Sequence, residues 1–323
     1  MRPRVLITRA LERGAREHFQ QTGWELVELE KPTPEALAEV LPGCDGVVSM
    51  LTDRFDASLF AHLRGSRLKL IANHAVGVDN IDLQAAAACG IQVSNTPGVL
   101  TEATAEFTLT LLLALLRRLG EGERLVRSGQ WQGWEPTQLL GRSIRGLRVG
   151  ILGAGRIGQA LGRMAHALGA QIAYSSRQPK PDFEQTCQAQ RLALPELLSQ
   201  SEALSLHLPG GPETHHLIDA YALNSLPQGA LLINTGRGTS VDQTALIAAL
   251  QSGQLGGAAL DVYACEPSVP DALCALENVV LAPHLGSATV ATRRAMALTC
   301  LRNLQAVFQG QPAPHQVRDH LQE

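Results

Sequence analysis

The stretch VGILGAGRIG, residues 149–158, decides the fold of this chain. Its core has the spacing Gly-x-Gly-x-x-Gly, follows an apolar run directly and opens a helical pattern. In such a strand–turn–helix unit, Gly153 permits the tight turn, Gly155 lets the backbone approach a pyrophosphate, and Gly158 lets helix and strand pack closely. The helix N-terminus adds free N–H groups and a partial positive charge, and we place Arg156 and Ile157 there. An ordinary glycine-rich turn is the alternative, but the flanking strand and helix favour a dinucleotide-binding site.

The end of the next strand, residues 171–175, indicates which dinucleotide is preferred. NAD sites usually place Asp or Glu there, about 20 residues past the glycines, to bind the ribose 2′-hydroxyl. Here the chain carries Ser175, Ser176 and Arg177, and no acidic residue. An Arg side chain can bind a 2′-phosphate through charge-assisted hydrogen bonds. We therefore expect NADP(H) as the preferred cofactor and NAD(H) as a possible one, although Arg177 could instead be a solvated loop residue that stacks on adenine.

Short apolar runs alternate with helical patterns along most of the chain, which predicts an α/β protein with parallel sheets. The expected strands are Val5–Thr8, Trp24–Glu28, Gly46–Ser49, Leu68–Ala72, Arg148–Leu152, Gln171–Ser175, Ala203–His207, Ala230–Asn234, Gly257–Asp261 and Val279–Ala282. Several are apolar on both faces, as parallel strands covered by helices on both sides require.

The position of the glycine motif predicts two domains, because a set of β–α units precedes it. We expect residues 100–287 to form a Rossmann-type, doubly wound dinucleotide-binding domain. Residues 1–99 and 288–323 should form a smaller, flavodoxin-like α/β substrate domain. One helical pattern, Thr101 to about Arg127, joins the halves, and another, from about Ser287 to Gln309, returns to the first domain.

Composition excludes several classes of function. The chain has 323 residues, of which 45% are hydrophobic and 18% charged, and its net charge is −3. It has only 3 Trp, 3 Tyr and 6 Phe and no long basic run, which argues against a nucleic-acid partner. The most apolar stretch, Thr108–Leu116, spans nine residues, whereas a membrane helix needs about 20. Six scattered cysteines without a CxxC pair, and an N-terminus unlike a signal peptide, favour a cytoplasmic protein.

Chemically capable side chains follow three of the expected strands. Because open α/β sheets bind ligands at the carboxyl ends of their strands, these side chains are candidates for one site. Each alone has a bland interpretation: a loop cap, a solvated carboxylate or a buried structural histidine. Their shared placement favours a catalytic set of Arg237, Glu266 and His284.

A longer series of segments resembles the D-isomer-specific 2-hydroxyacid dehydrogenases. In order, these are Val76–Asp82, Gly153–Gly158, His207–Pro209 with Pro212–Thr214, Asn234–Gly238, Asp261–Pro267 and Pro283–Thr289. Within that family the chain most resembles glyoxylate/hydroxypyruvate reductases, on the segments Leu100–Glu106, Gly129–Pro136 and Ser176–Pro179.

The resemblance implies a small-molecule 2-keto or 2-hydroxy acid substrate and a hydride from the nicotinamide. It implies that His284, as imidazolium, gives a proton to the carbonyl oxygen, while Glu266 pairs with the ring, favours its charged form and fixes it. Arg237 would bind the substrate carboxylate and polarise the carbonyl.

The same resemblance assigns further contacts. Backbone N–H groups at Val76 and Gly77 would bind the carboxylate, and Leu51 would line the substrate pocket. The remaining cofactor contacts would come from Thr104 and Thr235 near the nicotinamide, Asp261 on its carboxamide, and Leu208 and Pro209 near the adenosine. No metal is expected, because His215-His216 lacks a standard ligand spacing and the family chemistry needs none.

Family members use the segment with Trp131 and Trp134 as a dimer arm, so we expect a homodimer in which Trp134 shapes the partner's substrate pocket. The two tryptophans could instead be core residues.

Three alternatives remain at this point. The enzyme could prefer bulkier 2-keto acids. It could be a phosphite dehydrogenase, although that activity uses a Lys where this chain has Val76. It could also be a non-catalytic, nucleotide-sensing corepressor, although all three catalytic residues are present and no appended tail for a partner is evident.

Overall fold

The computed structural model describes residues 2–29 and 31–317, and the chain divides into two compact units. Unit 1 comprises Met1–Leu100 and Ala288–Glu323, and unit 2 comprises Thr101–Ser287. The boundaries expected from the sequence, 99/100 and 287/288, differ from these by one residue at the first crossing. Residues 318–323, assigned above to the first domain, lie outside the described residues.

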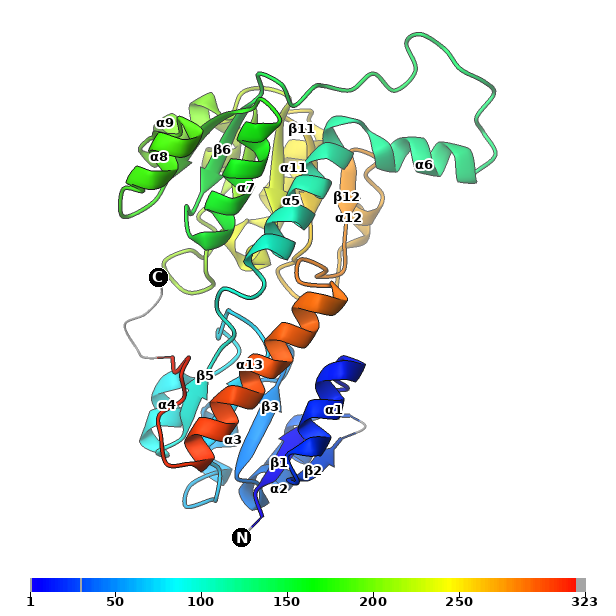
Figure 1. Ribbon diagram of the computed structural model, residues 1–323. Helices are drawn as coiled ribbons and strands as arrows, with labels where there is room; N and C mark the ends of the chain where they lie inside the picture. Colours follow the sequence, from blue (N-terminus) through cyan, green and yellow to red (C-terminus); the bar gives the residue numbers. More distant parts are fainter. Residues whose placement is uncertain (1, 30, 318–323) are drawn as a thin grey trace. The chain divides into compact units, whose positions relative to one another are not determined.

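Unit 1 contains a five-stranded parallel sheet with helices on both faces (Figure 1). Its strands, in spatial order, are β2 (Glu25–Glu28), β1 (Arg4–Ile7), β3 (Gly46–Ser49), β4 (Leu70–Asn73) and β5 (Gln92–Ser94). This 2-1-3-4-5 order is the flavodoxin-like one. Its helices are α1 (Arg13–Gln21), α2 (Pro34–Val40), η1 (Leu41–Gly43), α3 (Ala57–His62), α4 (Leu83–Ala88) and α13 (Val290–Phe308).

Two cores hold unit 1 together, one on each face of its sheet. Alternate residues of a strand point to opposite faces. Val5 and Ile7 of β1 pack with α1 and α13, whereas Leu6 packs with α2, α3 and α4. The strands are therefore apolar on both faces, as the sequence pattern predicts.

Unit 2 contains a seven-stranded parallel sheet (Figure 1). Its strands, in spatial order, are β12 (Val279–Leu281), β11 (Leu255–Leu260), β10 (Ala230–Asn234), β9 (Ala203–Leu206), β6 (Arg148–Leu152), β7 (Gln171–Ser175) and β8 (Gln190–Arg191). The chain starts at β6 in the middle, winds outward to β8, and then returns to β9 on the other side of β6. In a Rossmann-type sheet this reversal marks the ligand-binding edge. The predicted α/β fold class is thus confirmed.

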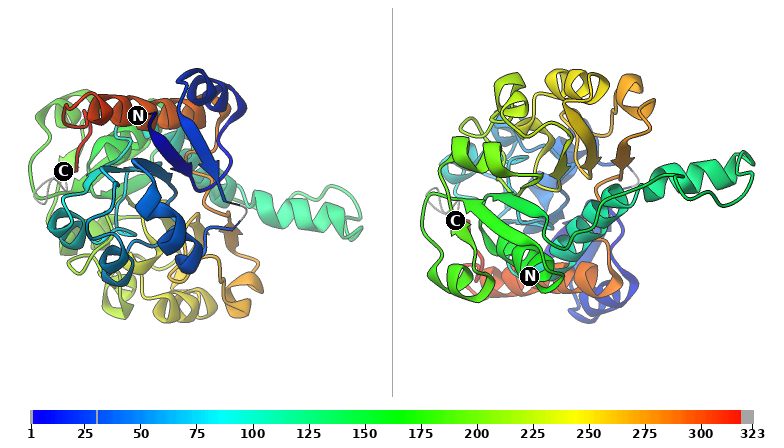
Figure 2. Two further views of the ribbon diagram at one scale, coloured as in Figure 1. Left: turned by 90° about the horizontal axis from the view of Figure 1, so that it is seen from below. Right: turned by 90° about the horizontal axis from the view of Figure 1, so that it is seen from above.

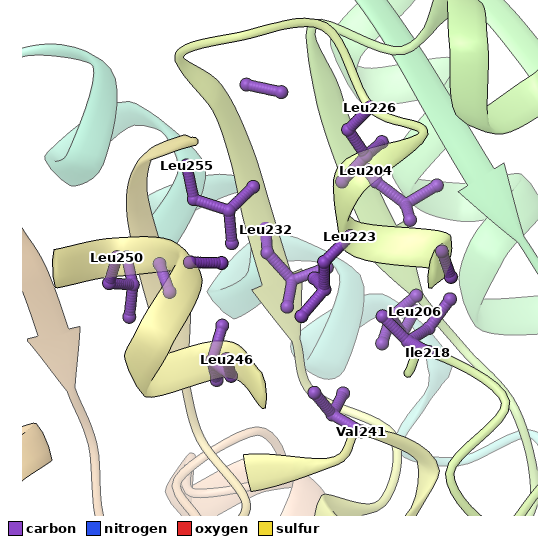
Figure 3. Close-up of a cluster of buried hydrophobic side chains, with 14 of the residues drawn as sticks. Leu204, Leu206, Ile218, Leu223, Leu226, Leu232, Val241, Leu246, Leu250 and Leu255 are labelled. Atoms are coloured by element: carbon purple, nitrogen blue, oxygen red, sulfur yellow. The ribbon is translucent and has the colours of Figure 1, made fainter. Parts of the chain in front are cut away.

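Helices cover both faces of the unit 2 sheet. The helices of unit 2 as a whole are α5 (Thr101–Leu116), α6 (Leu119–Arg127), α7 (Arg156–Ala167), α8 (Pro181–Cys187), α9 (Leu194–Gln200), α10 (Ala220–Asn224), η2 (Gly238–Ser240), α11 (Gln243–Gln251) and α12 (Asp271–Cys274). Helices α5, α7 and α8 share one core with the sheet, and α9, α10 and α11 share the other. Figure 3 shows the second core, where Leu232 and Leu204 of the sheet lie among leucines of α10 and α11.

The structure corrects the long helix expected from Thr101 to Arg127. Helix α5 ends at Leu116, and Arg118 adopts a left-handed backbone with φ of +51°. The Arg118 guanidinium binds Glu121 through two hydrogen bonds of 2.9 and 2.6 Å, which stabilises this break. Helix α6 then leaves the sheet of unit 2, and Figures 1 and 2 show that α6 and the loop after it extend away from that sheet.

Smaller differences concern element ends. The strand expected at Leu68–Ala72 is β4, which begins two residues later, at Leu70. The last helix begins after Thr289, whose hydroxyl accepts a hydrogen bond from the Thr292 N–H group and so caps the helix. The short strands β5 and β8 were not expected, because two or three residues carry too little pattern. Of the described helices, none combines the length and the apolar character that crossing a bilayer requires.

Candidate functional site

In the turn between β6 and α7, the space around each of the three glycines shows why a glycine stands there. A Cβ at Gly153, where φ is +97°, would lie 2.6 Å from the His207 carbonyl oxygen. A Cβ at Gly158 would lie 2.3 Å from the Gly153 carbonyl oxygen. A Cβ at Gly155 would meet no atom within 4 Å. Two of the glycines are thus required by packing, and Gly155 leaves open space in front of the backbone.

The N-terminus of α7 faces this open space. Gly155 caps the helix without a side chain, and within the described part of the chain the N–H groups of Arg156 and Ile157 have no acceptor. Unpaired N–H groups and the positive end of the helix dipole bind phosphate groups. The residues present therefore fit the pyrophosphate of a dinucleotide.

The loop that follows β7 contains Ser176 and Arg177. The Ser176 hydroxyl donates a 2.6 Å hydrogen bond to the Gln178 carbonyl, so its proton is used within the loop. The Arg191 guanidinium of β8 donates to the carbonyls of Ser176 and Arg177. Sequence reasoning missed Arg191, because β8 was not expected and its pairing with β7 brings the side chain to this loop.

Three threonines connect α5 to the end of β10. The Thr108 hydroxyl donates a 2.7 Å hydrogen bond to the Thr104 carbonyl and lies 2.8 Å from the Thr235 hydroxyl. Leu208, just after β9, packs beside Gly153, where a Cβ would lie 3.3 Å from its side chain. The expected cofactor residues Thr104, Thr235 and Leu208 are therefore all in unit 2, near the carboxyl ends of its strands.

Asp261, at the end of β11, is buried and has a structural role that the sequence did not predict. Its two carboxylate oxygens accept hydrogen bonds from the N–H groups of Leu285 (2.6 Å) and Gly286 (2.8 Å). Burial raises the pKa of Asp261, and these two N–H groups act in the opposite direction. The carboxylate thus fixes the turn immediately after His284.

His284 and Glu266 form a hydrogen-bonded pair. Nδ1 of His284 lies 2.9 Å from Oε2 of Glu266, and Oε1 of Glu266 accepts a hydrogen bond from the Tyr263 N–H group at 3.1 Å. The backbone of His284 is left-handed, with φ of +56°, and its N–H group donates to the Asp261 carbonyl. Such a conformation is costly for a residue other than glycine, so the surrounding bonds must hold it in place.

Electrostatics favour an ionised Glu266. Burial opposes ionisation, but the hydrogen bond and charge of His284, the Tyr263 N–H group and the charge of Arg237 outweigh it and lower the Glu266 pKa. With Nδ1 engaged by this carboxylate, Nε2 is the ring nitrogen left to act on a ligand. The pair can therefore hold a proton on His284 and deliver it from Nε2.

Arg237 follows β10 in a loop that its neighbours fix. Its carbonyl accepts hydrogen bonds from the Asn234 amide (2.9 Å) and the Ser240 hydroxyl (2.7 Å), and its own guanidinium donates to the Gly236 carbonyl. Because β10, β11 and β12 are neighbours in one parallel sheet, Arg237, Glu266 and His284 meet at one edge of unit 2. This edge combines a guanidinium, a carboxylate and an imidazole.

Unit 1 presents a candidate anion-binding loop at residues 75–78. The Asn95 amide donates to the Val76 carbonyl and the Asn73 amide donates to the Gly77 carbonyl, both at 2.8 Å. Among the residues that the structure describes, the N–H groups of Val76 and Gly77 have no acceptor. Turning carbonyls inward and N–H groups outward makes a loop that can bind a carboxylate.

The neighbouring loop of unit 1 carries Leu51, which is partly buried. Asn80 donates to the carbonyls of Met50 (3.2 Å) and Asp53 (2.8 Å), and the Asp53 carboxylate accepts from the Met50 N–H group at 2.7 Å. Sequence reasoning missed Asn73, Asn80 and Asn95. Their abundance around the Gly77 turn was a signal, but only the structure shows which carbonyls they bind.

The extended segment after α6 carries Trp131 and Trp134, with exposed fractions of 52% and 81%. The alternative that these tryptophans are core residues is therefore wrong for the single chain.

His215 and His216 stack with ring centroids 4.0 Å apart. Across residues 2–29 and 31–317, no group of three or more His, Cys, Asp and Glu side chains is placed to hold a metal ion.

Comparisons with known proteins agree on one family. The model of the D-isomer specific 2-hydroxyacid dehydrogenase, NAD binding domain, matches residues 109–286. A glyoxylate reductase of Thermococcus onnurineus is 44% identical over 322 residues, which cover 97% of this chain and 95% of that protein.

Solved structures are similar over nearly the whole chain. A protein from Thermus thermophilus superposes with a TM-score of 0.90 at 43% identity, over 98% of this chain and all of that one. An NADPH-dependent glyoxylate/hydroxypyruvate reductase from Sinorhizobium meliloti, solved with NADP and malonate, superposes with a TM-score of 0.88 at 36% identity, over 98% and 97% of the two chains.

Proposed function

The chain belongs to the D-isomer-specific 2-hydroxyacid dehydrogenases, and we propose that it reduces a small 2-keto acid, glyoxylate or hydroxypyruvate, with NADP(H). The product is the corresponding D-2-hydroxy acid. The observation that carries this proposal is the edge of unit 2 where Glu266 holds His284 at 2.9 Å and the charge of Arg237 helps to lower the Glu266 pKa. The names of the glyoxylate reductases to which the chain is similar support the substrate class.

When bound, the reduced nicotinamide supplies a hydride, which is a proton together with two electrons, to the keto carbon. His284 donates a proton from Nε2 to the keto oxygen, so that C=O becomes CH–OH. The Glu266 carboxylate stabilises the imidazolium before the transfer and keeps the ring in one orientation. Solvent returns the proton to His284 after the product leaves.

Arg237 provides the positive charge for the substrate carboxylate and for the negative charge that develops on the keto oxygen. In unit 1, the N–H groups of Val76 and Gly77, unpaired within the described residues, are proposed as neutral donors to a carboxylate. Leu51, on its fixed loop, is the proposed determinant of how large a substituent the 2-keto acid can carry.

NADP(H) is the proposed cofactor because Ser175, at the end of β7, and Arg177, in the loop after it, stand where an acidic residue would favour NAD. The NADP complex of the similar Sinorhizobium enzyme is consistent with this choice. The adenosine is proposed to lie against Leu208 and Pro209.

A homodimer is also proposed. The segment from α6 to residue 140 exposes Leu119, Val126, Trp131, Trp134 and Leu140, with exposed fractions from 52% to 81%. Large apolar side chains gathered on one extended segment are typical of an interface, and a second copy of this chain would cover them.

Steady-state kinetics test the function. The purified protein is mixed with glyoxylate, hydroxypyruvate, pyruvate and phenylpyruvate, each with NADPH and with NADH, and oxidation of the nicotinamide is followed by its near-ultraviolet absorbance. We expect the highest kcat/KM for glyoxylate or hydroxypyruvate with NADPH. Higher values for phenylpyruvate would assign a bulkier substrate, and no oxidation with any acid would refute the proposal.

A further inference from the structure

The two-residue strand β8 lies at the edge of the unit 2 sheet, next to β7. Its pairing aligns Arg191 with Tyr174, one residue before the end of β7. The Arg191 side chain is thereby brought to the loop of residues 176–180, which leaves β7 at the carboxyl edge of the sheet. No part of the function proposed above uses this side chain.

Arg191 holds this loop by hydrogen bonds from its guanidinium to backbone carbonyls of the loop. A single guanidinium nitrogen, Nη2, donates to the carbonyl of Ser176 at 3.1 Å and to the carbonyl of Arg177 at 3.0 Å. In a trans peptide the N–H group points away from the preceding carbonyl. Binding both carbonyls therefore turns the N–H groups of Arg177 and Gln178 away from Arg191.

A second anchor fixes the far end of the loop. The hydroxyl of Tyr174, whose ring is fully buried, accepts a 2.8 Å hydrogen bond from the Lys180 N–H group and donates to Glu184. With Arg191 at one end and Tyr174 at the other, the loop has a defined conformation before any ligand binds. A loop ordered in advance binds more tightly, because less entropy is lost on binding.

The charges around the loop favour an anion. Arg177, Lys180 and Arg191 are positive, and the nearest acidic residues along the chain are Asp182 and Glu184 in the first turn of α8. Glu184 is engaged by the Tyr174 hydroxyl. Nε and Nη1 of Arg191 have no acceptor within the described part of the chain, so this guanidinium keeps donors beyond those that hold the loop.

We propose that Arg191 is a positioning residue for the 2′-phosphate of NADP(H): by binding the carbonyls of Ser176 and Arg177 it orders the loop that recognises this phosphate, and it adds a positive charge there. The inference rests on the proposed use of NADP(H) at the same site. It adds a residue from a separate strand, and it makes discrimination between the two dinucleotides depend on the edge strand β8.

Binding of 2′,5′-ADP and 5′-AMP, the adenosine halves of NADP and NAD, tests the proposal without turnover. Isothermal titration measures the affinities of 2′,5′-ADP and 5′-AMP for the full chain and for Arg191→Met, Arg191→Lys and a control, Arg145→Met. Arg145 is exposed in the same unit and lies beside Gly169, where an added Cβ would be 3.3 Å from its side chain. Gly169 precedes β7, so the loss of Arg145 removes one charge away from the loop. Kinetics with NADPH and NADH accompany the titrations.

For Arg191→Met we expect about tenfold weaker 2′,5′-ADP binding and less than about twofold change for 5′-AMP, as the loss of charged hydrogen bonds predicts. The KM for NADPH should rise while kcat stays within about twofold, because His284 is untouched. Arg191→Lys should recover part of the affinity, since it keeps the charge and loses the planar fork. Arg145→Met should behave as wild type.

Equal weakening of both ligands by Arg191→Met, or no weakening of either, would overturn the role of Arg191. The wild-type chain separately reports on the proposed cofactor. Equal affinity for 2′,5′-ADP and 5′-AMP would overturn the NADP(H) preference and the inference with it. A clear wild-type preference that survives Arg191→Met would overturn only the inference.

Discussion

Gly155 and Gly158 are three residues apart, yet the structure predicts opposite consequences for replacing each by alanine. At Gly158 the new Cβ would lie 2.3 Å from the Gly153 carbonyl oxygen and 2.9 Å from a methyl of Ile151. The oxygen would have to move by about 1 Å to reach ordinary contact, and overpacking of this kind costs about 1–3 kcal/mol. Alanine is more favourable than glycine in a helix by up to about 1 kcal/mol, which is less than the upper part of this cost. The net effect of the substitution is therefore destabilising.

We therefore expect Gly158→Ala to lower the free energy of unfolding by about 1–2 kcal/mol, or the melting temperature by about 2–8 °C. At Gly155, φ is −74° and the new Cβ meets nothing, so Gly155→Ala should change the melting temperature by less than about 2 °C. Its methyl group instead occupies the space proposed for the pyrophosphate. NADPH affinity should fall at least about tenfold.

Thermal unfolding without and with NADPH separates the two effects. At 100 times Kd a ligand adds about 2.7 kcal/mol to the stability, and tenfold weaker binding halves this gain. Gly155→Ala should thus melt like wild type alone and gain much less from NADPH. Wild-type NADPH affinity in Gly155→Ala would show that no phosphate lies there, and an unchanged melting temperature in Gly158→Ala would refute the packing argument.

Four further predictions concern His284, Glu266 and Arg237 and the extended segment that follows α6. His284→Ala should lose about 10²–10⁴-fold in kcat, with NADPH affinity by titration unchanged, because it removes only the proton donor. Because the folded state lowers the Glu266 pKa below 4.5, ionised Glu266 stabilises the fold above that pH and this contribution is lost as pH falls through the lowered pKa. The melting-temperature difference between wild type and Glu266→Gln should accordingly be largest near neutral pH and shrink below about pH 4.5, and a difference that grows on acidification would contradict the sign. Arg237→Lys should raise the KM for glyoxylate about tenfold or more and leave the KM for NADPH unchanged, because an ammonium group cannot form the two parallel hydrogen bonds of a guanidinium. Trp134→Ala should weaken dimerisation measured by sedimentation velocity, and an unchanged dissociation constant would place the interface elsewhere.

The shared position of Arg237, Glu266 and His284 could be predicted from sequence because parallel strands end at a common edge. Arg237, Glu266 and His284 are far from one another along the chain, yet each follows a strand of the same sheet, so the β–α pattern alone brings them together. The glycine turn was predictable for a similar reason, since its strand, turn and helix are contiguous. Contiguous patterns need no knowledge of how distant segments pack.

The residues that sequence reasoning missed act through partners chosen by packing. Arg191 binds carbonyls 14 and 15 residues away, and Asn80 binds a carbonyl 30 residues away, in both cases because strand pairing or a shared loop edge brings them close. The break at Arg118 and the structural use of Asp261 were likewise invisible. A residue's type and the spacing of apolar positions therefore determined the fold class and the common sheet edge of Arg237, Glu266 and His284. Which carbonyls and N–H groups the polar side chains bind was decided only by tertiary structure, because a hydrogen bond depends on distances of a few tenths of an ångström that no periodic pattern encodes.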